Sequence, residues 1–465
     1  MESSNGLYIT GASGGDRFFY RVAEALKKDM NINPFYIATI ERNEEYLLSR
    51  GVPKKNIIGI YYTKEHFTAP TDLNFLHQKE EEYGFRFWDF WEVTAMRKKK
   101  RDKIQKEKIL FWFEYLVCKF EEIVEKIKPK YFFVYGPAGF HILIMYAIAK
   151  KKGIKILDFT ASPIHRRFTL MDSLNCSWPL IEKEYKKILK NGFSKEEKSA
   201  AWRFIQNYRN SPIVPTCRRK YNEPFPKKVK RYIYYARYII KKRELPIITN
   251  RLLWPAKKLM FNSINFFEKP IKNEKYVLFN LHFQPEISTS LYGKWFADQP
   301  YVIEQISKSL PLNYMLYVKE HPFGYGNRKL NFYKRIRRLR NVRLIDPTEN
   351  NFQLIKHASL IITITGTSGW EGLIFGKRVI TFGNTYYNLC KEVKHLRASE
   401  DLPQTIKESL DKKVDEKEII KFVAAMFRGT FPGLAWLPGD CAEQSTEKKN
   451  VLLIAEGVKK YILKE

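Results

Sequence analysis

The chain is poor in cysteine and has no paired-cysteine motif. Its 465 residues include five cysteines, an odd number, with no Cys-x-x-Cys spacing. They are scattered along the chain, at Cys118, Cys176, Cys217, Cys390 and Cys441. A disulfide framework needs paired cysteines and a structural zinc site needs clustered ones. We therefore expect reduced thiols in a cytosolic compartment and no zinc site.

Long apolar runs are also missing. No run reaches the ~18 residues that a membrane-spanning helix needs. The first fifteen residues lack the basic and then apolar pattern of a signal peptide. These absences predict a cytoplasmic protein that is soluble or peripheral to a membrane.

Acidic residues are few beside basic ones: 50 Asp and Glu face 82 Lys and Arg, for a net charge of +32. Such a surplus predicts an anionic partner, which could be nucleic acid, an anionic membrane face or an acidic substrate. An apolar content of 44% indicates a globular chain. Its length favours two domains, each with its own core.

The most informative stretch is Ala358–Asn384, which predicts a strand, a loop, a short helix and a second strand. The loop, Thr365–Gly369, consists of small residues and enters a helix N-terminus, where free N–H groups and the helix dipole suit a phosphate. Glu371, in the first helical turn, could accept hydrogen bonds from ribose hydroxyls. An ordinary βαβ turn with a solvated Glu371 fits the same pattern.

Two loops near the N-terminus offer further polar groups. The strand Gly6–Thr10 runs into a glycine-rich loop that lacks the G-x-G-x-x-G spacing, so a dinucleotide site is not favoured. We expect this loop to line the carboxyl edge of a parallel sheet and to direct Asp16 there. The strand Ile154–Phe159 leads into a second loop, in which His165 could hold an anionic acceptor or simply lie at the surface.

The middle of the chain interrupts the α/β alternation. Lys227–Arg243 carries eight basic residues and no acid on a Tyr- and Ile-rich segment, and Arg251–Phe267 adds apolar residues beside lysines. A basic amphipathic helix with interfacial aromatics suits an anionic lipid surface. A helix packed on its own domain and an RNA-binding surface are the alternatives.

Strands resume at Tyr276–Asn280, and three of the later strands are followed by polar groups. These are His282, His321 and Thr365. Because parallel strands end at one edge of a sheet, three such endings predict a cleft for a phosphorylated ligand.

Several of these residues resemble one known family. The motif Lys319–Pro322 (KEHP), Asp346 and the stretch Thr365–Gly383 resemble the donor-binding half of GT-B glycosyltransferases. The similarity is to the capsular polysaccharide biosynthesis group that includes bacterial Kdo transferases. The segment Leu281–Glu286 (LHFQPE) resembles surface-polysaccharide members of that group.

The resemblance implies an α/β protein of the GT-B class, with two Rossmann-like domains facing a cleft. The basic middle region has no counterpart in the family, and we expect it to form a helical insertion between the two domains. The expected domains are an N-terminal acceptor domain (1–175), a helical basic and aromatic region (176–272), a nucleotide-sugar donor domain (273–410) and closing helices that cross back to the first domain (411–465).

The resemblance also implies a donor site in which His321 contacts the phosphate, the Gly366–Ser368 loop cradles it and Glu371 holds the ribose. The expected donor-binding residues are His282, Gln284, Glu286, Lys319, Glu320, His321, Gly366, Thr367, Ser368 and Glu371. The nucleotide sugar is expected to be CMP- or UDP-linked, with no further cofactor. No Asp-x-Asp element is present, so we expect no metal and a leaving group neutralised by backbone amides and basic side chains.

Transfer with inversion needs a base beside the acceptor hydroxyl. Asp16 is the first candidate and His165 the second.

Together these observations predict a metal-independent, inverting glycosyltransferase of capsular or lipopolysaccharide-type biosynthesis. It would act on a lipid-linked or saccharide acceptor at the inner face of the cell membrane. A nucleotide-sugar 2-epimerase of the same fold is the alternative enzyme. A basic nucleic-acid-binding protein is an alternative of another class; its binding would fall steeply with salt, and nucleic acid is not the expected partner.

Overall fold

The computed structural model describes residues 2–10, 15–61, 71–90, 106–137, 139–212, 266–284, 286–322, 324–325, 327–435 and 442–464. The chain forms two compact units. Unit 1 comprises Met1–Ser194, Pro285–Tyr292 and Lys421–Glu465, and unit 2 comprises Lys195–Gln284 and Gly293–Ile420. The basic segment Lys227–Arg243, and nearly all of Arg251–Phe267, fall outside the described residues. No helix within the described ranges is long and apolar enough to cross a bilayer.

Unit 1 is built on a seven-stranded sheet in the order β13-β6-β5-β4-β1-β2-β3. Its strands are β1 (Ser4–Thr10), β2 (Ile32–Ala38), β3 (Ile57–Gly59), β4 (Tyr131–Val134), β5 (Lys155–Ala161), β6 (Arg167–Met171) and β13 (Phe431–Pro432). The strands from β3 to β5 are parallel, whereas β6 and β13 are antiparallel to their neighbours. The antiparallel edge was not predicted from the sequence.

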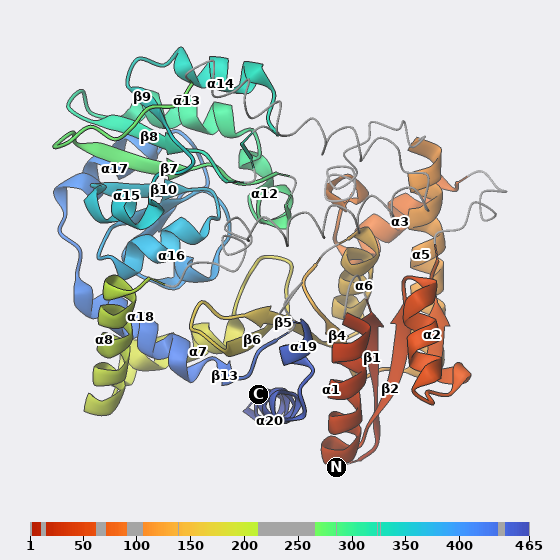
Figure 1. The fold of residues 1–465 in the computed structure, drawn as a ribbon. Coiled ribbons are helices and arrows are strands. Elements are labelled where there is room, and N and C mark those ends of the chain that lie inside the picture. The colour runs from red at the N-terminus through yellow and green to blue at the C-terminus, as the bar shows by residue number, and fades with distance from the viewer. Residues whose placement is uncertain are drawn as a thin grey trace, which may run out of the picture. The chain divides into compact units, whose positions relative to one another are not determined.

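Helices cover both faces of this sheet (Figure 1). They are α1 (Gly15–Met30), α2 (Glu41–Ser49), the 3₁₀ turn η1 (Lys54–Asn56), α3 (Leu73–Tyr83), α5 (Lys106–Ile127), α6 (Phe140–Lys151), α7 (Pro179–Asn191), α12 (Ile287–Ser290), α19 (Ala442–Ser445) and α20 (Lys448–Lys464). Helices α3, α5 and α6 pack on one face, and α1 and α20 on the other. Helix α20, at the end of the chain, therefore shares a hydrophobic core with α1, near its beginning.

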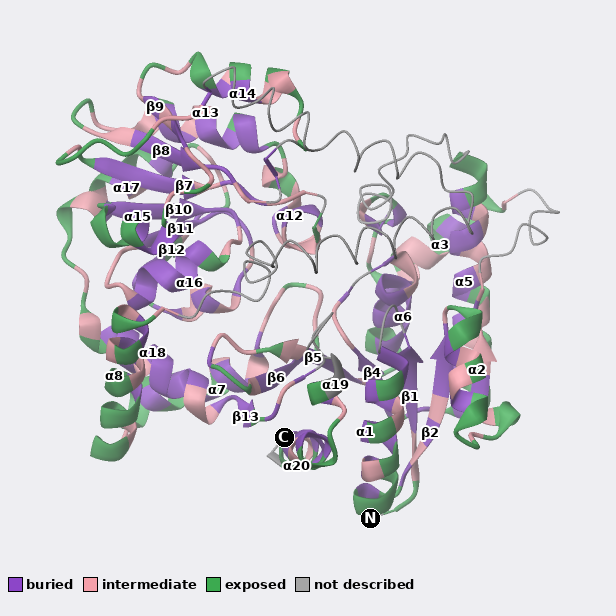
Figure 2. Cartoon of the chain, in the orientation of Figure 1, coloured by how far each residue is buried: buried purple, intermediate pink, exposed green. Residues whose placement is uncertain are grey.

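The strands of unit 1 form because apolar side chains run continuously through them. All four residues of β4 (YFFV) are buried, as expected of a strand with helices on both faces. Tyr8 and Phe133 are register partners on β1 and β4, and their rings stack at 4.2 Å between centroids. Figure 2 shows burial following the strands of each sheet.

Unit 2 contains an all-parallel, six-stranded sheet in the order β12-β11-β10-β7-β8-β9. Its strands are β7 (Tyr276–Asn280), β8 (Met315–Lys319), β9 (Val342–Ile345), β10 (Leu360–Thr363), β11 (Val379–Thr381) and β12 (Val393–His395). Two sheets dominated by parallel strands make the protein α/β, consistent with two Rossmann-like domains.

The helices of unit 2 also lie on both faces of its sheet. They are α8 (Lys195–Asn210), η4 (Lys294–Phe296), α13 (Gln299–Ser309), α14 (Leu330–Arg337), α15 (Asn351–His357), α16 (Thr367–Ile374), η5 (Tyr386–Leu389) and α17 (Leu402–Asp411). Helices α13, α14 and α17 share one core, and α15 and α16 contact each other. Helix α18 (Glu416–Arg428) begins in unit 2 and ends in unit 1.

Candidate functional site

The site of unit 2 is formed at the carboxyl edge of its sheet. The adjacent strands β10, β7 and β8 end at Thr363, Asn280 and Lys319. All are parallel, so the loops that follow them emerge at the same edge, where open α/β sheets bind ligands.

The loop that enters α16 is held in one conformation by its neighbours. The Gly366 N–H donates to Thr363 Oγ1 at 3.0 Å, and the Tyr387 hydroxyl donates to the Gly366 carbonyl at 2.5 Å. A Cβ atom on Gly366 would lie 2.7 Å from Thr363 Oγ1 and 3.2 Å from His282 Nε2. The position therefore requires glycine for close approach, and its N–H is already used within the protein.

Three polar groups at the start of α16 are left for a ligand. The N–H groups of Thr367 and Ser368 make no hydrogen bond within the described part of the chain. The Ser368 hydroxyl is buried, 3% exposed, and also lacks a partner among the described residues. Gly366, the N-cap, provides no side-chain cap. Unpaired donors at the positive end of a helix dipole suit an anion such as phosphate.

Glu371 lies one turn further along α16 and is buried, 4% exposed. Its Oε2 accepts a hydrogen bond from Asn351 Nδ2 at 2.9 Å, and Asn351 Oδ1 accepts one from Asn280 Nδ2 at 2.7 Å. Asn280 thus orients Asn351, which in turn holds the Glu371 carboxylate. The ribose contact of Glu371 stays a prediction from the sequence.

His282, which follows β7, accepts the Thr365 N–H at its Nε2 atom, 3.1 Å away. Burial, and secondarily the nearby Arg328 and His321 charges, lower the pKa of His282 to about 3. The imidazole is therefore neutral at ordinary pH. Gln284 is also engaged, because its Nε2 donates to the Ala297 carbonyl at 2.8 Å.

The KEHP motif organises the loop after β8. Glu320 has a fully buried side chain, and its carboxylate accepts the His321 N–H at 2.6 Å, Arg328 Nε at 2.9 Å and the Tyr333 hydroxyl at 2.5 Å. Lys319 is buried, and its ammonium donates to the Pro347 carbonyl at 2.9 Å. His321 is half-buried, with its ring 5.8 Å from that of Phe283. Of the three, His321 is the most exposed to a ligand.

Glu286 was grouped with the donor-binding residues, but its segment, Pro285–Tyr292, belongs to unit 1. Ile287 and Leu291 of that segment pack against the unit 1 core. The Glu286 carbonyl accepts the Ser290 hydroxyl at 2.9 Å, and burial raises the pKa of the Glu286 carboxyl.

Unit 1 carries both candidate bases. Asp16 lies in the first turn of α1, directly after the loop that follows β1, and is 3% exposed. His165 is exposed, in the turn between the antiparallel strands β5 and β6. Arg167, two residues further on, donates to Thr430 Oγ1 at 2.7 Å and to the Phe427 carbonyl at 2.9 Å. It secures the C-terminal segment.

Asp158 is a buried carboxyl that the sequence reading overlooked. It lies in β5 with no exposed surface, accepts the Gly136 N–H and the Tyr146 hydroxyl at 2.6 Å each, and neighbours Tyr135 and Tyr292. Burial raises the pKa of Asp158 to about 7, against the lowering effect of both hydrogen bonds. The signal available was an acidic residue inside an otherwise apolar strand.

Other organising residues gave no local signal. Gln299, Arg328, Asn351 and Tyr387 lie 15 to 71 positions from most of the groups they hold. Only the folded chain brings them together.

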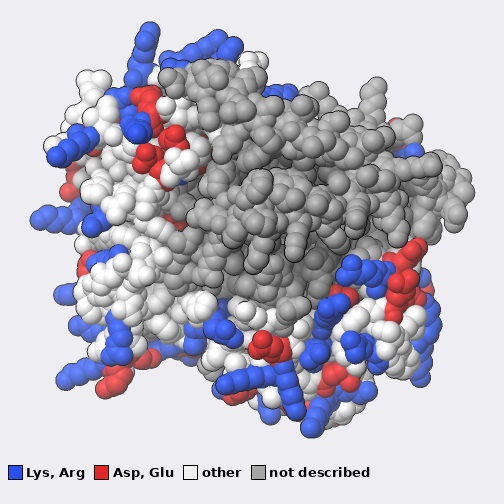
Figure 3. Space-filling model, in the orientation of Figure 1, with Lys and Arg blue, Asp and Glu red and all other residues white. Residues whose placement is uncertain are grey.

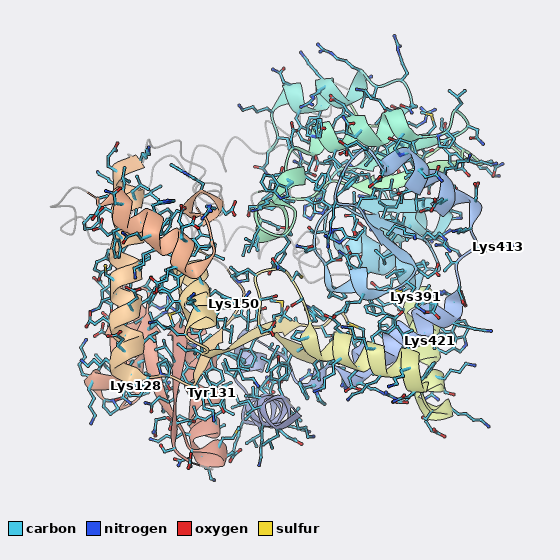
Figure 4. All side chains as sticks on the ribbon, turned by 180° about the vertical axis from the view of Figure 1, so that it is seen from behind. Lys128, Tyr131, Lys150, Lys391, Lys413 and Lys421 are labelled. Atoms are coloured by element: carbon cyan, nitrogen blue, oxygen red, sulfur yellow. The ribbon has the colours of Figure 1, made fainter. Side chains whose placement is uncertain are left out.

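On the face shown in Figure 3, the basic side chains that are described are scattered rather than gathered in one stripe. Lys128 and Lys150 of unit 1, and Lys391 and Lys413 of unit 2, are exposed examples labelled in Figure 4. Within the described residues, no group of three or more His, Cys, Asp or Glu side chains could hold a metal ion.

The fold and site define an α/β protein in which a helix start, with polar groups unpaired among the described residues, lies at the carboxyl edge of a parallel sheet. The sequence model of the family described as "Capsule polysaccharide biosynthesis protein" matches residues 151–391, more than half of the chain. The chain belongs to this family of capsule polysaccharide biosynthesis proteins. No curated protein matches it.

Solved structures with similar folds are distant in sequence. The beta Kdo 2,7 transferase of Thermosulfurimonas dismutans KpsC is 11% identical, with a TM-score of 0.39, over 84% of this chain and 89% of that one. The beta Kdo 2,4 transferase of the same KpsC is 16% identical, with a TM-score of 0.38, over 64% and 79%. The UDP-GlcNAc 2-epimerase of Neisseria meningitidis is 12% identical, with a TM-score of 0.32, over 99% and 100%. At these values the likeness assigns no residue a role.

Proposed function

We propose that the protein is a GT-B glycosyltransferase of surface-polysaccharide assembly, and that unit 2 binds its nucleotide-sugar donor. The observation that carries the proposal is the start of α16, where the Thr367 and Ser368 N–H groups and the Ser368 hydroxyl have no partner within the described ranges. Glu371 lies on the same helix within one turn. The N–H groups can donate hydrogen bonds to a phosphate, and the Glu371 carboxylate can accept them from ribose hydroxyls. Groups of these two kinds at this spacing suit a nucleotide.

Unit 1 would bind the acceptor, a lipid-linked or saccharide hydroxyl compound, and Asp16 would take its proton. The donor phosphate would leave as an anion stabilised by the α16 N–H groups without a metal. Contact with an anionic membrane face is an expectation from the sequence alone. A nucleotide sugar that isomerises with no acceptor present would favour the 2-epimerase instead.

The donor site is tested by nucleotide binding. The Glu371→Gln variant keeps an oxygen to accept from Asn351 but loses the charge offered to ribose. We expect its affinity for the best ligand among CMP, UDP, GDP and CDP to fall by about 1.5–3 kcal/mol, the range for a hydrogen bond to a charged group. Isothermal titration calorimetry measures this loss.

Glu400→Gln, at an exposed acid of unit 2, is the matched surface-charge control. Its affinity should equal that of the wild type. If folded Glu371→Gln protein binds every nucleotide as well as the wild type does, Glu371 does not hold the ribose.

The base is tested by Asp16→Asn, since asparagine has nearly the same shape but cannot take a proton. We expect turnover to fall by about 10²-fold or more while donor affinity and folding persist. Product formation with a synthetic acceptor is measured by mass spectrometry. Near-normal turnover would move the assignment to His165, and His165→Gln is then the variant to assay. The anomeric configuration of the product, read by NMR, tests inversion.

A further inference from the structure

The backbone of His282 is held on both sides by one buried side chain. Gln299, with no exposed surface, accepts the His282 N–H at 2.7 Å through Oε1 and donates to the His282 carbonyl at 3.1 Å through Nε2. Arg328 Nη2 donates to the same carbonyl at 2.5 Å. These three hydrogen bonds fix the position of the His282 backbone, and with it the point from which the side chain extends.

The imidazole is fixed in one tautomer as well. Because His282 Nε2 accepts the Thr365 N–H, this nitrogen carries no proton and the ring hydrogen is on Nδ1. The Nδ1 atom is itself buried and has no hydrogen-bond partner among the described residues. Because this nitrogen is buried, it offers no exposed atom to a ligand at the loop.

We propose that His282 is a positioning residue, which does not touch the nucleotide but shapes its phosphate loop through the Thr365 N–H. Its Nε2 accepts a hydrogen bond from the Thr365 N–H, and Thr363 Oγ1 accepts one from the Gly366 N–H, so the first two N–H groups of the loop are satisfied. The next two, Thr367 and Ser368, then remain for the anion. This inference rests on the proposed donor site, and it replaces the direct donor contact that the sequence predicted for His282.

Two substitutions separate indirect from direct action. In His282→Gln the Oε1 atom is as many bonds from Cα as Nε2 is, so it can accept the Thr365 N–H, but no donor replaces Nδ1–H. In His282→Asn the amide reaches only as far as Nδ1, so it keeps a donor there and loses the acceptor for Thr365. The two variants are each other's matched control.

We expect the dissociation constant for CMP or UDP, whichever the wild type binds, to stay within about threefold in His282→Gln and to rise tenfold or more in His282→Asn. Calorimetry on folded protein measures both. The reverse order would show direct contact through Nδ1 and overturn the proposal, as would wild-type affinity in both variants.

Amide hydrogen exchange separates this inference from the donor site itself. In the protein without nucleotide, the peptide spanning Thr363–Trp370 should exchange as in the wild type in His282→Gln, and at least tenfold faster at the loop amides in His282→Asn. If the wild type binds neither nucleotide, the donor site is wrong, and the exchange result still decides the role of His282. Equal exchange in all three proteins would refute it.

Discussion

Asp158→Asn is expected to remove a loss of stability that the wild-type protein suffers as the pH rises toward 7. The fold raises the pKa of Asp158 from 3.8 to about 7 through burial. Between these values the native state holds a proton that the unfolded state lacks, so the free energy of unfolding falls as the pH rises. Each pH unit is worth about 1.4 kcal/mol, and the whole window amounts to roughly 4 kcal/mol.

The asparagine variant has no charge to bury, and its amide oxygen can still accept the Gly136 N–H. At pH 8 it should be more stable than the wild type, whereas at pH 4 the two should be similar. Urea unfolding followed by circular dichroism at pH 4, 6 and 8 measures the difference. Tyr146→Phe is the control, because it removes one hydrogen bond and leaves the carboxyl titratable. An unchanged pH dependence in Asp158→Asn would contradict the raised pKa of this carboxyl.

The second large effect has the opposite sign and belongs to His282 in unit 2. Its pKa is lowered from 6.5 to about 3, first by burial and then by the Arg328 and His321 charges. Below pH 6.5 the unfolded state binds a proton that the native state refuses, so stability present above pH 6.5 is lost as the pH falls toward 3. The full window is worth roughly 5 kcal/mol. His282→Gln, which has no titratable group, should lack this loss.

The two slopes oppose each other between about pH 4 and 6.5, so the wild type can look insensitive to acid there. We therefore expect the His282 effect to be clearest in an Asp158→Asn background. There, stability should fall from pH 6.5 to pH 4, and adding His282→Gln should remove the fall. His77→Gln, at an exposed histidine of unit 1, is the matched control and should change nothing. A similar fall in the double variant would assign the acid sensitivity to another group.

The local pattern of the sequence predicted the strand Tyr276–Asn280 at its observed bounds. The strands predicted at Gly6–Thr10 and Ile154–Phe159 form within two residues of the predicted bounds. Such predictions succeed because buried strands and amphipathic helices have short apolar repeats that can be read within a few residues. The small-residue loop before α16 was found in the same way, since a close approach of backbone groups requires glycine.

Contacts across long stretches of chain were not predictable in this way. The pairing of β6 with β13 joins Phe168 to Phe431, and nothing in either segment indicates the other. The hydrogen-bond partners of Glu320 could not be predicted either. A carboxylate in a sequence motif gives no sign of whether it faces a ligand or, as here, accepts three hydrogen bonds from its own protein.

The sequence by itself determined the α/β class, the strand ends that carry polar groups and the phosphate-type loop, because each depends on neighbours along the chain. Only the tertiary structure decided which of those groups remain free for a ligand. The Thr365 and Gly366 N–H groups donate to His282 and Thr363, whereas those of Thr367 and Ser368 have no acceptor in the part of the chain that the structure describes. An N–H group donates to the acceptor that the fold places within about 3 Å of it. Packing between strands that are far apart in sequence decides which acceptor that is.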